Sequence, residues 1–206
     1  MQLRFKCNLT GEEYVSQKAW RNASLMCCPL HPKGGCGIAR HGTYERTSPP
    51  GTHVARWYCP EGHCTFSLLP DCLAARLPGT LAEVEAVVIA VEQARSLEAA
   101  CEELRIDIDL PGALRWIRRR VKAIHLLLIT LKGLIPEYFE GCEVNLVTFL
   151  QRIAVDAHLP ALREIAAPHL SFLPSPLGFK PHRPRSGEPE RVLQHPMGPD
   201  PPAALA

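Results

Sequence analysis

Cysteine and histidine residues gather in two short clusters in the first third of the chain, and their spacing suits a metal site. The first cluster is Cys28-Pro-Leu-His-Pro-Lys-Gly-Gly-Cys36, and the second is Cys59-Pro-Glu-Gly-His-Cys64. Zinc prefers four thiolate or imidazole ligands in a tetrahedron, which proteins usually supply as pairs from two tight turns. Proline and glycine favour such turns. The two clusters therefore predict one zinc site.

The fourth ligand has more than one candidate. The predicted thiolate ligands are Cys28, Cys36 and Cys59. Either His63 or Cys64 can complete the set, because both spacings from Cys59 can close around one ion. His31 competes with Cys36 in the first cluster, since Cys-x2-His is also a common ligand spacing.

A structural role for this zinc is predicted rather than a catalytic one. A catalytic zinc keeps a position open for water and usually has a carboxylate base nearby. Glu61 is the only acid within the clusters, and a tight turn would expose it to solvent. The other five cysteines have no partner at this spacing and are interpreted as small packing side chains: Cys7, Cys27, Cys72, Cys101 and Cys142.

Composition limits the class of protein. The 206 residues include 23 Lys and Arg against 21 Asp and Glu, so net charge alone indicates no partner. The N-terminus lacks the apolar core of a signal peptide, and the longest apolar run, Leu126–Ile129, is far too short to span a bilayer. Nine cysteines in a chain without a secretion signal favour a reducing interior, where paired cysteines bind metals. We therefore expect a cytoplasmic protein with no membrane partner.

The elements around the clusters are short. Residues 1–26 are interpreted as an N-terminal extension with a helix over Glu12–Trp20, for which Thr10 and Glu13 form a capping box. Residues 27–78 are the predicted zinc ribbon, with strands over 41–47 and 53–58 joined by a Pro-Gly turn. This segment is poor in aliphatic residues, so the metal is expected to stabilise it.

Beyond residue 79 the apolar residues recur every three or four positions, which predicts helices. The expected helices cover residues 81–95, 97–104, 111–131, 144–157 and 159–166, with Ser96 capping the second. Residues 169–206 are Pro-rich and basic and are interpreted as a tail, disordered from residue 174. The predicted fold class is small α+β: a zinc-ribbon β module (27–78), an all-α helix-turn-helix-like bundle (79–168) and this tail.

The helix expected over 111–131 has two different faces. One carries apolar residues, and the opposite one carries Arg115, Arg118, Arg119 and Lys122. A helix in the major groove of DNA needs such cations for phosphates and guanine edges. The preceding helix and the break at 105–109 suggest a helix-turn-helix, although the break is longer than usual and has no glycine. The alternative is a bundle helix with a solvated basic face.

Several segments together resemble a known family. Arg40–Arg46, Arg56–Pro60 and Thr65–Pro70 are similar to the N-terminal zinc ribbon of bacterial insertion-sequence transposases and of small proteins associated with mobile elements. The resemblance covers residues 27–125. It implies a ribbon and a helix-turn-helix that together recognise the ends of a DNA element. Phosphate contacts from Arg40, Arg46 and Arg56 on the ribbon would complement those of the basic helix.

The chain departs from this family in two respects. Both cysteine pairs are more widely spaced than the usual Cys-x2-Cys. Full transposases of this kind also carry a ribonuclease-H-like domain whose three acidic residues hold magnesium, and the acids after residue 105 here lie on or beside predicted helices. A converging carboxylate set for metal catalysis is therefore not expected.

The leading hypothesis is a non-catalytic, transposase-related protein that binds double-stranded DNA and is associated with the nucleoid. A separate transposase subunit is the second expected partner. One alternative is a protein-interaction module in which zinc is only a structural knot and residues 124–135 bind the partner. Another alternative is a truncated or degenerate transposase.

Overall fold

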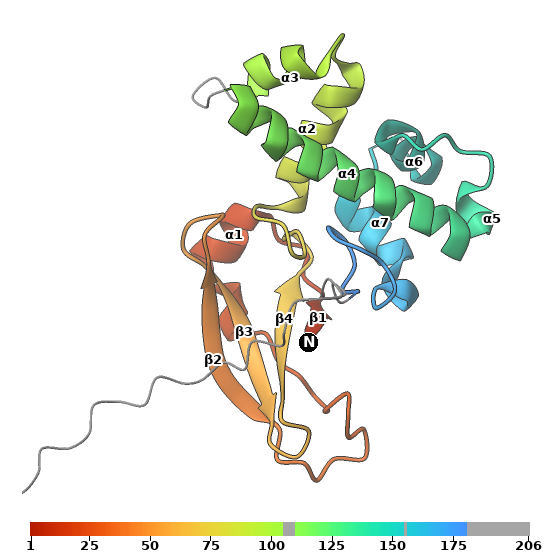
Figure 1. The fold of residues 1–206 in the computed structure, drawn as a ribbon. Coiled ribbons are helices and arrows are strands. Elements are labelled where there is room, and N and C mark those ends of the chain that lie inside the picture. The colour runs from red at the N-terminus through yellow and green to blue at the C-terminus, as the bar shows by residue number, and fades with distance from the viewer. Residues whose placement is uncertain (105–109, 155, 181–206) are drawn as a thin grey trace, which may run out of the picture.

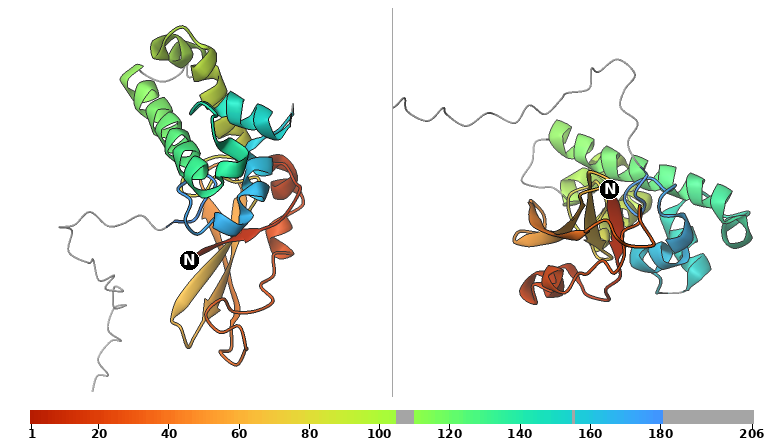
Figure 2. Two further views of the ribbon diagram at one scale, coloured as in Figure 1. Left: turned by 90° about the vertical axis from the view of Figure 1, so that its right-hand side faces the viewer. Right: turned by 90° about the horizontal axis from the view of Figure 1, so that it is seen from below.

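A computed structural model describes residues 1–104, 110–154 and 156–180 and shows a small α+β fold (Figure 1). The sheet has four strands, and the helices gather toward one end of it, as Figure 2 also shows. The strands are β1 Gln2–Phe5, β2 Ala39–Arg46, β3 Thr52–Cys59 and β4 Cys64–Pro70. The α-helices are α1 Gly11–Ser16, α2 Leu81–Gln93, α3 Leu97–Leu104, α4 Leu110–Leu134, α5 Pro136–Phe139, α6 Leu146–Ile153 and α7 Leu159–Ile165. Two 3-10 turns are η1 Ala19–Arg21 and η2 Ala167–His169.

The sheet is larger than the sequence predicts. Its order is β1-β4-β3-β2, with antiparallel pairing except between β1 and β4, which run parallel. The assignment of residues 1–26 to an extension is therefore wrong in part, because residues 2–5 form an edge strand. Strand β1 satisfies backbone groups of β4 that would otherwise lack partners, and its residues Leu3 and Phe5 pack on the buried sheet residues. Strand β4 was also missed.

The predicted helix starts are confirmed where a capping residue marks them. Thr10 and Glu13 form the expected capping box, although α1 ends at Ser16 and a 3-10 turn follows. Thr80 and Glu83 form a second capping box at the start of α2. The Ser96 hydroxyl accepts a hydrogen bond from the backbone N–H of residue 99, as an N-cap does.

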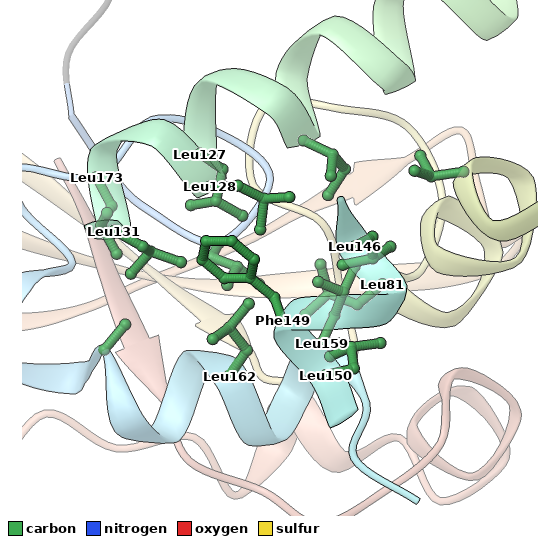
Figure 3. Packing of buried hydrophobic residues seen from close by; sticks show 14 of the residues in the cluster. Leu81, Leu127, Leu128, Leu131, Leu146, Phe149, Leu150, Leu159, Leu162 and Leu173 are labelled. Carbon is green, nitrogen blue, oxygen red and sulfur yellow. The ribbon is translucent and has the colours of Figure 1, made fainter. Parts of the chain in front are cut away.

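The helices share one apolar core. Figure 3 shows its centre, where leucines of α4, α6 and α7 surround the Phe149 ring. Phe149 stacks on Phe139 with 4.6 Å between ring centroids. Helix α4 contributes four fully buried residues to this core: Ile124, Leu127, Leu128 and Leu131. In the described part of the chain, no helix combines the length and the apolar character needed to cross a bilayer.

The chain after α7 packs against the rest of the protein, so the predicted tail does not begin at residue 169. Leu170, Leu173 and Leu177 are buried in the helical core, and the backbone N–H of Ala75 donates to the Pro176 carbonyl at 2.8 Å. Burial of these three leucines favours an ordered conformation of this Pro-rich segment. The part of the predicted tail from residue 181 to 206 lies outside the described residues.

A buried arginine joins the end of the sheet to the helices. The Arg163 guanidinium donates four hydrogen bonds of 2.8–3.2 Å to carbonyl oxygens of Pro70, Asp71, Leu73 and Pro176. Its side chain has no solvent exposure, and burial lowers its pKa to about 10, so it stays charged at neutral pH. At the same junction, Arg4 pairs with the buried Asp71 and with the exposed Glu164, and Lys6 also pairs with Glu164.

Candidate metal centre and basic helix

Four potential metal ligands meet at the end of the sheet that lies farthest from the helices. The ligand atoms of Cys28, His31, Cys36 and Cys59 all lie within 4.8 Å of one another. Three of the residues come from the loop between η1 and β2, and Cys59 ends β3. This loop meets the β3–β4 turn at the lower end of the sheet in Figure 1.

Tight turns aim these side chains at a common point. The His31 N–H donates to the Cys28 carbonyl at 3.1 Å, which places the two side chains beside each other. Gly34 and Gly35 then adopt φ angles of 81° and 87°, which favour glycine, and so let the chain turn back toward Cys36. In the β3–β4 turn, the Gly62 N–H donates to the Cys59 sulfur at 3.3 Å, a contact suited to a thiolate.

The distances between these atoms fit a tetrahedral zinc ion. His31 Nδ1 lies 3.6 Å from Cys28 Sγ and 3.4 Å from Cys59 Sγ. A sulfur about 2.3 Å and a nitrogen about 2.1 Å from a tetrahedral zinc are about 3.6 Å apart. Three thiolates and one imidazole fill all four positions, and the three cysteines are buried. This donor set suits a structural site, because no position is left for a reacting water.

Neighbouring groups change the pKa of the Cys28 thiol and orient the His31 ring. Burial raises the pKa of the Cys28 thiol, but hydrogen bonds from His31 and from backbone N–H groups outweigh it and lower the pKa to about 7. On the far side of the imidazole, His31 Nε2 lies 3.5 Å from a carboxylate oxygen of Glu61. A carboxylate at that nitrogen favours the tautomer whose Nδ1 is free for a metal. Glu61, considered above only as a catalytic base, is thus placed to orient a ligand.

The predicted ligands have different fates. Cys28, Cys36 and Cys59 are brought together as expected, whereas His63 and Cys64 are not in the group. His63 is turned toward the Tyr58 hydroxyl, 3.3 Å from its Nδ1, and the Cys64 sulfur lies near the Thr65 carbonyl. His31 takes the fourth place. The Cys-x2-His spacing marks His31 in the sequence as an alternative to Cys36. In the structure the long glycine-containing loop lets both residues reach the site.

The basic residues of α4 lie on its outer face. Arg115, Arg118, Arg119 and Lys122 are exposed, and none of the ion pairs within residues 1–104, 110–154 and 156–180 involves them. Arg120 lies on another side of the helix. It is buried, covers the Trp116 ring at 3.8 Å and donates to the Pro78 carbonyl at 3.3 Å.

A hollow beside this helix adds a cation that the sequence did not indicate. Its volume is about 410 Å³, and Arg76, from the segment before α2, lines it together with Arg115 and Arg119. The remaining lining residues are Leu77, Pro78, Gly112, Trp116 and Arg120, so no carboxylate among the described residues lines it. Arg76 is far from α4 in the sequence, and its segment meets the helix where Arg120 donates to the Pro78 carbonyl.

Of the three arginines predicted to contact phosphates from the ribbon, Arg40 and Arg46 are hydrogen-bonded within the protein. Arg40 donates to the carbonyls of Trp20 and Arg21, and Arg46 donates to those of Ala74 and Leu77. Burial lowers the pKa of Arg46. Arg56 is half-buried on β3. The bonds of Arg40 and Arg46 to carbonyls give both side chains a structural role in holding the loops around the sheet.

Helices α3 and α4 follow one another and pack together, but the predicted break at 105–109 lies outside the described residues. The helix-turn-helix arrangement therefore stays a prediction. No family model, no curated protein and no solved structure matches this chain. The resemblance to transposase ribbons likewise stays a prediction, and the residues at the two sites carry the functional argument.

Proposed function

We propose that this chain is a DNA-binding protein in which a structural zinc ion fixes the far end of the sheet and the outer face of α4 contacts duplex DNA. The observation that carries the proposal is the exposed cationic face of Arg115, Arg118, Arg119 and Lys122, which no carboxylate in the described residues neutralises by ion pairing. Cations without an ion-pair partner favour binding to DNA, because they neutralise phosphates and release the counterions condensed on the duplex.

The spacing of these side chains suits a nucleic acid. Arg115 and Lys122 are seven residues apart, about 10 Å along a helix, which is comparable with the width of the major groove. The acids Glu98, Glu102 and Glu103 of α3 would repel phosphates. The side of α4 that carries Arg115 and Arg119 and faces Arg76 is therefore the favoured side of approach.

Zinc has a supporting role in this proposal. The four ligands lie at the opposite end of the sheet from the loop that contacts α4, so the ion itself does not touch the proposed DNA surface. It would instead hold β2 and β3 in register. Arg46, at the end of β2, would then hold the segment around Leu77 near α4.

The test is a binding titration of the zinc-loaded protein against a short random-sequence duplex at several salt concentrations. Arg115→Gln/Arg119→Gln should weaken binding by about tenfold or more and reduce the salt slope by about 2, one per lost phosphate contact. The matched control is Lys18→Gln/Lys180→Gln, which removes two exposed charges elsewhere and should leave the affinity within about twofold. Equal effects in both variants, or none in the first, would reject the proposal.

The resemblance to transposase ribbons suggests a specific duplex, the end of a mobile element, and a separate catalytic subunit as partner. A selection of bound duplexes from a random pool tests the first suggestion. Recovery of one inverted-repeat motif supports it, and a pool that stays random contradicts it.

The protein-interaction alternative has less apolar surface than the sequence suggests. In the stretch 124–135, most apolar side chains face the helical core, and the large exposed ones are Leu126 and Ile129, at 52% and 57% exposure. Size-exclusion chromatography of Leu126→Ser/Ile129→Ser against the unmodified chain separates the two functions. A loss of self-association with intact DNA binding assigns these two residues to a protein contact.

A further inference from the structure

Two cysteines that have no role at the metal centre lie together at the other end of the sheet. Strands β1 and β4 run parallel and end side by side at Phe5 and Pro70. Cys7 and Cys72 each follow two residues later, and the Arg4–Asp71 ion pair, with N···O distances of 2.6 and 2.8 Å, fixes the two segments against each other. Parallel pairing thus brings together two thiols that are 65 positions apart in the sequence (72 − 7).

The two thiols lie near each other. Cys7 packs against the buried cluster that contains Cys72, and the two thiols are close enough to shift each other's pKa. Cys72 is 7% exposed, and its carbonyl accepts from the Leu81 N–H at 2.8 Å, which fixes its backbone. Cys7 is half-buried. Neighbouring thiols on segments held in this way are placed to form a disulfide.

Their surroundings make the two sulfurs unequal. The hydrogen bond with Cys72 is the largest cause that lowers the pKa of Cys7, to about 6, and backbone N–H groups at Asp71 and Leu9 assist against the effect of burial. The same hydrogen bond, together with burial, raises the pKa of Cys72. Cys7 is also the more exposed of the two, so it is the sulfur that a dissolved reagent reaches first.

Small molecules can reach this pair. Both cysteines line a cavity of about 700 Å³ between the N-terminal loop, the start of α2 and the start of α7. That volume is within the range of small-molecule sites in proteins. The charged groups that line the cavity are mostly paired: Arg4 with Asp71 and Glu164, Lys6 with Glu164, and His158 with Glu85 at 2.8 Å.

We propose that Cys7 and Cys72 form a peroxide-reactive dithiol at the wall of this cavity, in which Cys7 reacts first and Cys72 resolves the product. The Cys7 thiolate attacks one oxygen of hydrogen peroxide, the O–O bond breaks, and hydroxide leaves and takes up a proton. The Cys72 sulfur then attacks the resulting sulfenic acid, an S–S bond forms, and water leaves. In total the two thiols lose two protons and two electrons, and one peroxide becomes two waters.

The test is disulfide mapping of the zinc-loaded full chain after treatment with one equivalent of hydrogen peroxide and alkylation of the remaining thiols. Trypsin releases residues 7–18 and 57–76, and cleavage after Phe66 then separates Cys72 from Cys59 and Cys64. The expected product is one cross-linked peptide pair, Cys7–Cys72, that appears before zinc is released to a chromogenic chelator. Cross-links among Cys28, Cys36 and Cys59 that appear first would overturn the proposal.

Three variants sharpen this test. Cys72→Ser should leave a sulfenic acid on Cys7 that dimedone traps, and Cys7→Ser should abolish peroxide modification of Cys72. The matched control is Cys101→Ser, which removes a buried cysteine on α3 and should leave the Cys7–Cys72 yield unchanged. If a variant fails to fold, disulfide mapping of the unmodified chain still tests the proposal. A Cys7–Cys72 yield no greater than the yield of disulfides that include the exposed Cys27 would refute it.

Discussion

The helical core and the far end of the sheet are stabilised by different means. The largest cluster of buried residues, in the helices, has 21 members, most of them Leu, Ile, Val or Phe. The cluster at the end of the sheet has four buried members, and three of them are the cysteines of the candidate metal centre. Burial of apolar surface therefore explains the stability of the helical core, whereas the far end of the sheet has little apolar surface to bury.

The difference has a thermodynamic consequence. A buried Leu or Phe side chain contributes about 1.5–3 kcal/mol, so the helical core gains from many small terms. A structural zinc contributes about 10–16 kcal/mol in small zinc modules, concentrated in one site. Each single substitution in the helical core should therefore remove only part of its stability. The far end of the sheet should instead unfold when one metal ligand is lost.

The largest expected effect is the loss of the metal. Cys59→Ser should reduce bound zinc from about one per chain to nearly none, because a hydroxyl replaces a buried thiolate ligand. Hydrogen exchange should then rise in residues 27–66 while residues 124–135 stay protected. The control Cys64→Ser should keep its zinc. A complete loss of zinc in that control would make Cys64 a ligand and contradict the His31 assignment.

The second effect concerns the helical core and should leave the metal centre unchanged. Phe149→Ala should lower the free energy of unfolding by about 3–5 kcal/mol, because it leaves a cavity beside Phe139 in the helical core. The bound zinc should not change. Urea unfolding of the zinc-loaded protein measures the first quantity, and metal analysis measures the second. Phe172→Ala is the matched control, since Phe172 is 62% exposed and should cost less than about 0.5 kcal/mol.

The third effect tests how the two regions are coupled. Arg163→Met keeps much of the side-chain volume but removes four buried hydrogen bonds to carbonyl oxygens, at an expected loss of roughly 3–5 kcal/mol. Exchange should rise together in residues 70–76 and 174–180, because Arg163 joins both. Arg152→Met, which removes an exposed guanidinium bonded to one carbonyl, should lose less than about 1 kcal/mol. Similar losses in the two variants would assign no special role to Arg163.

The smallest effect is a pH dependence at the surface of the same junction. Hydrogen bonds from Lys6 and then Arg4 lower the pKa of Glu164 below its ordinary value of 4.5. Its contribution to stability is therefore complete above pH 4.5 and is lost as the pH falls through the lower folded value. Glu164→Gln should flatten the acid side of a Tm–pH profile by no more than about 2 °C, because the pair is exposed. The exposed Glu137→Gln should reproduce the unmodified profile, and a flattened profile there would show that the effect is not specific to Glu164.

Local patterns predicted most of the elements correctly. The strands expected at 41–47 and 53–58, the capping residues Thr10 and Ser96, and the helices at 81–95 and 97–104 depend on neighbours a few positions apart. Their causes are alternation, capping hydrogen bonds and helical periodicity, which a sequence displays directly. Three of the four clustered candidate metal ligands were predicted in the same way, because ligand spacing is also a local pattern.

The remaining features depend on contacts between distant segments. Strand β1 exists because β4 offers it a parallel edge, Arg76 joins the α4 hollow because its segment meets Arg120, and Cys7 meets Cys72 at the end of that same strand pair. The choice of His31 over His63 and Cys64 was set by how a loop folds over the β3–β4 turn. Sequence alone determined which residues could bind metal, form helices or meet phosphates. Only the tertiary structure decided which of them meet, because a long-range pairing is selected by the whole packing and leaves no periodic trace in the chain.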